Sequence, residues 1–156
     1  MPRLRSAAKL PLLALALLAG ACDGGPFGPS GAEAELRAAR ARWERQGAAD
    51  YAYTVRRTCF CGPDVAGPVR VEVRGGRTVS VSPFEGRPLF PGAFDRLDTV
   101  EEMFASVQDA IDAGPYLLDA RYDPARGYPV SVAVDYERNA VDDEGGFVVS
   151  DFVLLR

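Results

Sequence analysis

The chain has 156 residues, of which 47% are hydrophobic, and its 22 acidic residues exceed its 18 basic ones, for a formal charge of −4. A chain of this size is typical of one folded domain with a single core, and its acidity excludes the broad basic surface that nucleic-acid binding needs. The sequence has no histidine, no serine-nucleophile motif, no glycine-rich phosphate loop and no zinc signature. We therefore expect a protein that is not an enzyme and has no cofactor or metal.

The N-terminal segment has the pattern of an export signal. An apolar run over residues 10–18 follows three basic residues, Arg3, Arg5 and Lys9, and small residues come after it. The run is shorter than the roughly 20 apolar residues that a membrane-spanning helix needs. The pattern predicts a signal peptide over residues 1–21.

The end of this signal, LLAGAC, resembles the lipobox of bacterial lipoproteins. In that family a signal peptidase cuts before the cysteine, which becomes the lipid-modified first residue. Cys22 is the matching cysteine, and Ala19 stands where the family most often has leucine. The alternative is ordinary secretory cleavage with Cys22 as a free thiol, which an oxidising compartment disfavours. The resemblance implies a palmitate-bearing lipoprotein of the bacterial cell envelope, anchored in the membrane and facing the extracytoplasmic side.

Cleavage before Cys22 would leave 15 basic and 22 acidic residues, a formal charge of −7. Residues 22–31 are rich in glycine and proline, a composition that predicts a flexible linker behind the lipidated cysteine. We expect one folded domain over residues 32–156.

Capping boxes, which pair a serine or threonine with a glutamate three residues later, mark helix starts at Ser30 and Thr99. The first helix should cover residues 32–46, and Gly114-Pro115 should end the second. Apolar residues recur at helical spacing behind both starts: Leu36, Ala39, Trp43, Val100, Phe104, Val107 and Ile111.

Three strand patterns follow each helix. In order they are YAYTVRR, VRVEV, RTVSV, YLLDARY, YPVSVAVDY and GFVVSDFVLL. Residues 83–97 contain three prolines and two glycines, and we expect a long connection that packs partly on the core. The order α-βββ-α-βββ with short links predicts an α+β fold, with two helices packed on one face of an antiparallel sheet.

Two loops would close the hairpin in VRVEVRGGRTVSV. A two-residue loop at Gly75-Gly76 puts the two rows of valines on opposite faces. A three-residue loop that begins at Arg74 pairs Val71 with Val79 and keeps one face apolar. We therefore predict the three-residue loop.

Cys59 and Cys61 are the only cysteines beside Cys22. On an extended strand their Cα atoms would lie about 6.6 Å apart, near the upper end of disulfide geometry. A bridge would need a bend, which Gly62-Pro63 favours. In an oxidising compartment we expect a local disulfide. The alternatives are two reduced thiols, a redox-active pair without the usual C-x-x-C spacing, and a Cu(I) or zinc site.

An acidic set around one turn forms a second candidate site: Asp123, Asp135, Asp142, Asp143 and Glu144. Several of these carboxylates could reach one end of the sheet, which would suit a hard cation such as Ca²⁺. The EF-hand spacing is absent, so the interpretation that we favour is a solvated turn. Nothing places two of them across a cleft for glycoside hydrolysis.

The stretch YDPARGYP, residues 122–129, is a third candidate. Asp123-Pro124 favours a turn, Gly127 permits a positive φ, and Pro129 can begin a strand. The pattern predicts a hairpin connection, and a ligand-binding loop is the alternative.

Taken together, several motifs resemble a family of bacterial lipoproteins that is classified as domain of unknown function 6174. The matching segments cover residues 34–154: YAYTVRRTCFC, VRVEVRGGRTVSV, TVEEMF, YDPARGYPVSVAVD and DDEGGFVVSDF, with Trp43 on the first helix. The resemblance implies a lipoprotein with an α+β domain. It implies no activity.

Two functions remain. The first is a non-catalytic, membrane-anchored envelope lipoprotein that binds an envelope protein partner or a ligand, and no nucleic acid. The alternative is a thiol redox or metal-handling protein that uses Cys59 and Cys61.

Overall fold

A computed structural model describes residues 31–86, 88–140 and 142–156. The predicted signal peptide, Cys22 and the linker up to residue 30 lie outside the described residues. The described elements are α1 (Gly31–Gln46), β1 (Tyr51–Cys59), α2 (Pro63–Ala66), β2 (Val69–Arg74), β3 (Arg77–Pro83), the 3₁₀ turn η1 (Phe84–Gly86), α3 (Val100–Ala113), β4 (Leu117–Tyr122), β5 (Pro129–Asp135) and β6 (Gly145–Leu154).

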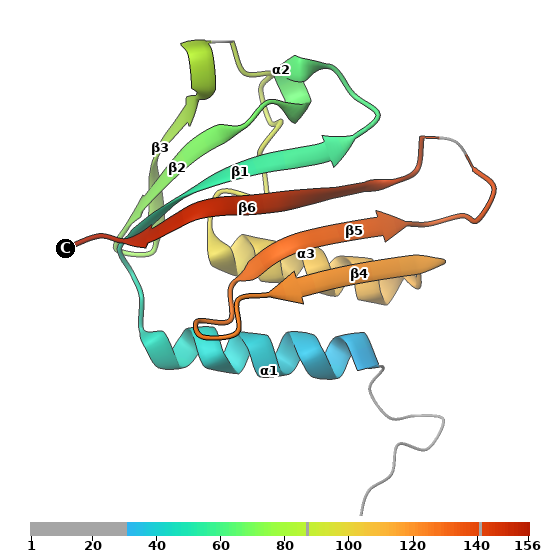
Figure 1. Cartoon of the computed structure of the whole chain (residues 1–156), viewed down its shortest axis with the longest axis horizontal. Helices are drawn as coiled ribbons and strands as arrows, with labels where there is room; N and C mark the ends of the chain where they lie inside the picture. Colours follow the sequence, from blue (N-terminus) through green and yellow to red (C-terminus); the bar gives the residue numbers. More distant parts are fainter. Residues whose placement is uncertain (1–30, 87, 141) are drawn as a thin grey trace, which may run out of the picture.

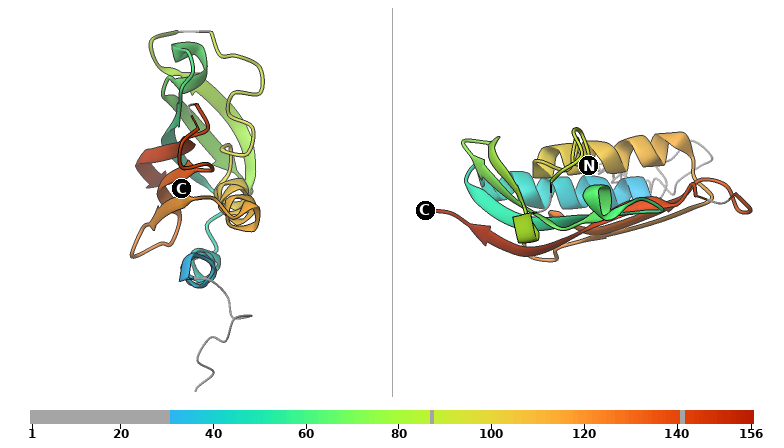
Figure 2. Two further views of the ribbon diagram at one scale, coloured as in Figure 1. Left: turned by 90° about the vertical axis from the view of Figure 1, so that its right-hand side faces the viewer. Right: turned by 90° about the horizontal axis from the view of Figure 1, so that it is seen from above.

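The six strands form one antiparallel sheet in the order β3-β2-β1-β6-β5-β4 (Figure 1). Each half of the chain supplies a three-stranded meander, and β1 pairs with β6 to join the two halves. The two long helices lie on the same face of the sheet (Figure 2). The predicted α+β fold is therefore confirmed, with the one-turn elements α2 and η1 added to it. None of the described helices is long and apolar enough to cross a membrane.

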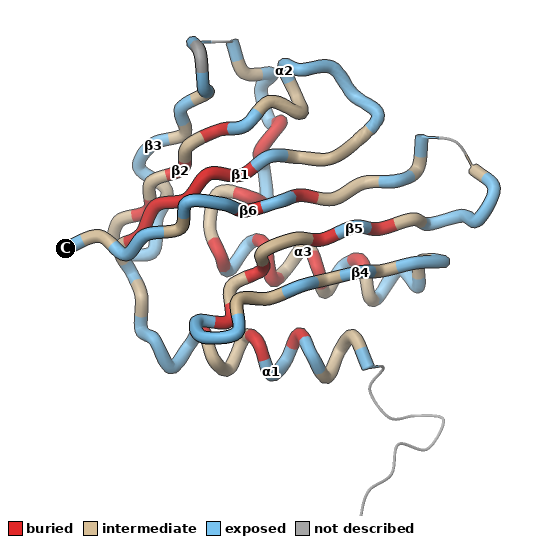
Figure 3. The backbone as a smooth tube through the Cα atoms, in the orientation of Figure 1, coloured by how far each residue is buried: buried red, intermediate tan, exposed pale blue. Residues whose placement is uncertain are grey.

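Both helices face the sheet with the apolar residues that the sequence pattern indicates, although Ile111 is only half-buried at the edge of the core (Figure 3). At the start of α3 the Thr99 hydroxyl accepts a hydrogen bond from the backbone N–H of Glu102 at 3.1 Å, as the capping box predicts. Gly114 ends this helix with φ 65°, a conformation that glycine adopts without strain. The buried helix residues are Leu36, Ala39, Trp43, Val100, Met103, Phe104, Val107 and Ala110.

The β2–β3 hairpin differs from the prediction. Arg74 pairs with Arg77 across a two-residue Gly75-Gly76 loop, so the predicted three-residue loop is wrong. A bulge in β3 then places an extra residue in that strand, so that Val71 lies opposite Val81. Because a bulge shifts the alternation by one residue, a two-residue loop and an apolar inner face can coexist.

The aromatic core is centred on Trp43. Its ring lies edge-on to Tyr51, with ring centroids 5.2 Å apart, and to Phe152 at 5.9 Å. The indole Nε1–H donates to the carboxylate of Glu101 at 2.9 Å, and the Tyr51 hydroxyl donates to the same carboxylate at 3.1 Å. These contacts join α1, β1 and the first turn of α3.

The long connection before α3 also packs on the core, as expected. Ala93, Phe94 and Leu97 are buried. The Tyr53 hydroxyl donates to the backbone carbonyl of Leu97 at 2.7 Å. The connection is therefore fixed against the middle of β1 by a hydrogen bond as well as by apolar contact.

The loop between β4 and β5 approaches the backbone of α1 at Gly127. This residue has φ 92°, and an added Cβ would meet the Ala39 carbonyl and the Trp43 nitrogen. Gly127→Ala should therefore lower the free energy of unfolding by about 1–3 kcal/mol through overpacking, with backbone strain added to it. Urea denaturation followed by Trp43 fluorescence measures the change.

Gly47→Ala is the matched control for Gly127→Ala. Gly47 also has a positive φ, 59°, but an added Cβ there would meet nothing within 4 Å. Its substitution should cost only the strain of the backbone conformation, about 1–2 kcal/mol. Equal losses at the two positions would show that the close approach to α1 is unimportant.

Alkaline pH should unfold the protein through its buried tyrosines. Burial raises the pKa of Tyr122 to about 12, and burial also raises the pKa values of Tyr51 and Tyr53. Their ordinary pKa is about 10, so the folded protein holds these protons more tightly than the unfolded chain. The stabilisation is complete below about pH 10 and is lost as the pH rises through the folded-state values.

Urea midpoints measured from pH 8 to pH 12, with tyrosinate absorbance recorded in parallel, test this expectation. The midpoint should fall above about pH 10, and late tyrosine ionisation should coincide with unfolding. Complete ionisation of every tyrosine in a protein that stays folded would contradict it.

Candidate functional site

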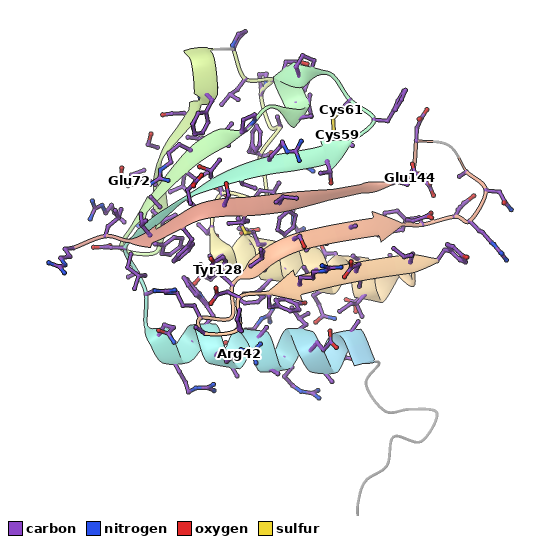
Figure 4. The ribbon with its side chains drawn as sticks, in the orientation of Figure 1. Arg42, Cys59, Cys61, Glu72, Tyr128 and Glu144 are labelled. Atoms are coloured by element: carbon purple, nitrogen blue, oxygen red, sulfur yellow. A yellow bond between two sulfur atoms is a disulfide. The ribbon has the colours of Figure 1, made fainter. Side chains whose placement is uncertain are left out.

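Two of the segments singled out in the sequence meet at one end of the sheet. Cys59, the last residue of β1, pairs with Gly145, the first residue of β6, and Gly145 pairs with Val134 of β5 on its other side. The C-x-C stretch and the acidic turn before β6 therefore lie at the same sheet end. Figure 4 shows Cys59, Cys61 and Glu144 there, with Glu72 at the opposite end.

Cys59 and Cys61 form a close pair in disulfide geometry, with 5.3 Å between their Cα atoms. This distance is shorter than the extended value of about 6.6 Å, so the chain bends here, and α2 begins directly afterwards at Pro63. The residue between the cysteines, Phe60, points outward, and 84% of its surface is exposed. The close pair thus shapes a short loop that presents an aromatic side chain to solvent.

An open hollow of about 480 Å³ lies beside Phe60. We call it the Phe60 hollow, and its lining includes Thr58, Phe60, Leu117, Ala133, Asp135, Glu144 and Gly145. Ala133 and Asp135 alternate along β5 with the buried valines that face the helices. They therefore belong to the other face of the sheet, over which none of the described helices lies.

Small residues on three neighbouring strands near this sheet end explain why the surface is hollow here. Gly146 pairs with Thr58 on one side and with Ala133 on the other, so a row of small residues crosses three strands. Gly145 adds a second position without a side chain. Leu117, which is 48% exposed and pairs with Asp135, and Phe60 stand at the edges. The hollow is thus an apolar depression between two large exposed side chains.

The predicted acidic set is divided. Asp135, Asp142, Asp143 and Glu144 lie at the sheet end beside the hollow, whereas Asp123 follows β4 at the opposite end of β5. Asp143 accepts a hydrogen bond from the backbone N–H of Glu137 at 2.6 Å, which closes the turn. Among residues 31–86, 88–140 and 142–156, no three acidic or cysteine side chains are placed to hold a metal ion.

The stretch that contains Asp123 is a hairpin connection, as the sequence predicts. The Asp123 carboxylate accepts a hydrogen bond from the backbone N–H of Ala125 at 3.0 Å, and Gly127 contacts α1. Tyr128 stacks on Phe152 with ring centroids 4.2 Å apart. These contacts fix the hairpin to α1, and they give Asp123 a structural role away from the Phe60 hollow.

Arg57 lies close to the same sheet end but on the helix side. Its Nε donates to the carbonyl of Ala93 at 2.7 Å, beside a second cavity of about 310 Å³. Burial lowers the pKa of Arg57, and the Asp95 carboxylate partly opposes this effect. Arg96, at the rim, pairs with Asp109 at 2.6 Å. The Arg57 contact ties the connection before α3 to β1, and the Arg96 ion pair ties it to α3.

A family model described as a family of unknown function, DUF6174, matches residues 35–154. The chain belongs to this family. The matched DUF6174 region contains both long helices apart from the first residues of α1, all six strands and every residue of the Phe60 hollow. The comparisons with curated proteins and with solved structures find no match. The matched region begins after Cys22, so the lipid anchor stays a prediction.

Sequence reasoning identified the cysteines of this DUF6174 domain but missed Phe60, Leu117 and Ala133. The outward direction of Phe60 could have been predicted locally. The cysteines on either side of it point toward each other, so its own side chain points away from them. Leu117 and Ala133 carry no comparable signal. Their place depends on the pairing of three strands, which only the complete sheet register supplies.

Proposed function

We propose that this protein is a non-catalytic envelope lipoprotein that binds a partner protein at the Phe60 hollow. The observation that carries the proposal is an exposed phenylalanine, held on a cysteine-bounded loop next to an open apolar depression. Aromatic side chains beside such depressions often supply most of the energy of a protein interface.

The remaining features support this function. The proposed acyl chains on Cys22 and the linker would hold the domain near the membrane while allowing it to reorient. Within residues 31–86, 88–140 and 142–156 the helices cover one face of the sheet, and no described helix lies over the face with the Phe60 hollow. A disulfide between Cys59 and Cys61 would keep the Phe60 loop rigid, which reduces the entropy lost on binding.

Site-specific photo-crosslinking tests the proposal. In the full-length protein, p-benzoylphenylalanine replaces Phe60 and keeps an aromatic group on the loop. After irradiation of bacterial cells we expect a discrete adduct with one protein. Leu117→Arg in the same chain should abolish the adduct, because it removes an apolar edge of the hollow and places a positive charge there. Chemical reduction before irradiation should weaken the adduct by releasing the loop.

The same crosslinker at Phe90 is the matched control. Phe90 is also exposed, at 57%, but lies in the connection before α3 and does not line the Phe60 hollow. It should give no equivalent adduct. Identical adducts from positions 60 and 90, or an adduct that Leu117→Arg leaves unchanged, would refute a docking site at the Phe60 hollow.

A further inference from the structure

The charge around the Phe60 hollow indicates which partner it fits. Of the described residues that line it, Asp135 and Glu144 are acidic and none is basic. Asp143 and the exposed Asp142 belong to the same turn as Glu144, and the acidic residues of this turn outnumber its one basic residue, Arg138, which lies over the Tyr116 ring. The hollow therefore combines an apolar floor with an acidic rim.

Two of these carboxylates are incompletely satisfied. One oxygen of Asp135 and one oxygen of Asp143 are buried and have no hydrogen-bond donor among the described residues. A buried acceptor without a donor costs free energy, and a charged acceptor costs more than a neutral one. A cationic group placed against this rim would offset the negative charge of these two carboxylates, which the hydrogen-bond donors of the described residues do not fully satisfy.

The apolar part of the site is an open depression of about 480 Å³, which has room for an inserted side chain. Phe60 and Leu117 rise on either side of the small residues Ala133 and Gly145. An inserted aliphatic or aromatic side chain would contact both of them and remove exposed apolar surface from water. The carboxylates at the rim would then lie beside the flanking residues of the inserted segment.

We propose that the Phe60 hollow recognises a cationic, apolar protein segment. A leucine or phenylalanine enters the hollow, and a neighbouring arginine or lysine pairs with Asp135 and Glu144. This inference rests on the proposed function and specifies the chemistry of the partner. Because the ion pairs lie at an open rim, they contribute selectivity and salt dependence more than affinity.

Two synthetic peptides test the inference. They have the sequences Arg-Leu-Phe-Leu-Arg and Glu-Leu-Phe-Leu-Glu, with both ends blocked. Each is titrated into the mature chain, residues 22–156, in which Cys22→Ser prevents acylation, and amide NMR shifts report binding. The arginine peptide should bind at least tenfold more tightly than the glutamate peptide, and it should shift the amides of Phe60, Ala133 and Gly145. Its affinity should fall severalfold between 50 mM and 500 mM salt.

Variants separate the apolar and the ionic parts. Phe60→Ser should weaken binding of the arginine peptide at least tenfold. Asp135→Asn combined with Glu144→Gln should reduce the difference between the two peptides and flatten the salt dependence. Phe90→Ser and Glu72→Gln are the matched controls and should leave binding unchanged, since neither residue lines the hollow.

Equal affinity for the two peptides, or shifts that map away from the hollow, would overturn the inference. Preferential binding of anionic lipid vesicles over the arginine peptide would overturn it as well, because the occupant would then be a membrane. These results are distinct from a failure of the proposed function. A Phe60-specific protein adduct together with equal peptide affinities would refute the cationic partner alone.

Discussion

Replacement of Trp43 by alanine is expected to lower the free energy of unfolding by about 3–5 kcal/mol, the usual cost of removing a buried tryptophan side chain. Trp43 is 3% exposed and contacts Tyr51, Tyr128 and Phe152. The substitution would leave a cavity where α1, β1, β6 and the β4–β5 loop meet. Domains of this size have stabilities of about 5–15 kcal/mol, so the loss is a large part of the total.

The measurement is urea denaturation followed by far-ultraviolet circular dichroism, because the substitution removes the only tryptophan. Trp43→Phe keeps an aromatic ring but loses the indole N–H that donates to Glu101, and it should cost less, about 1–2 kcal/mol. Phe60→Ala is the control. This side chain is 84% exposed, so its loss should change stability by no more than about 0.5 kcal/mol.

The control has a second use, because Phe60 is central to the proposed docking site. A stable Phe60 variant that loses binding would show that the loss reflects a missing contact and not unfolding. If Trp43→Ala and Phe60→Ala destabilised the protein equally, the assignment of Trp43 to the core and of Phe60 to the surface would be wrong.

The elements that local sequence could predict are those with local causes. A hydroxyl at Thr99 and a glycine at position 114 define α3 without help from the rest of the chain. The strands could be predicted in the same way, because the alternation of valines is also a local pattern. The β3 bulge could not be predicted, because its free-energy gain comes from placing Val81 opposite Val71, a contact between strands.

The candidate site also depends on contacts between strands that local sequence does not predict. The cysteine pair was predicted from two neighbouring residues and the compartment. The hollow beside it is lined by Thr58, Gly145 and Ala133, three residues that are brought together only when β1, β6 and β5 pair. The sequence pattern predicts Asp123 in one acidic set with Asp135. The length of β5 places them at opposite ends.

Replacement of Cys22 by alanine is expected to remove the proposed lipid anchor. Cells grown with an alkyne-bearing palmitate analogue should label the wild-type protein, and the label should be lost completely in Cys22→Ala. Each buried CH₂ group contributes about 0.8 kcal/mol of membrane affinity, so one cysteine with several acyl chains would decide where the protein resides. A chain in which a cleavable secretory signal without cysteine replaces residues 1–22 should move from the membrane pellet to the soluble fraction.

The other two cysteines provide the control for this experiment. Cys59→Ser combined with Cys61→Ser removes both thiols of the domain but leaves the lipobox-like segment unchanged. This variant should be labelled and should sediment with membranes as the wild type does. Label that persists in Cys22→Ala, or label that is lost only in the double variant, would place the acyl group elsewhere.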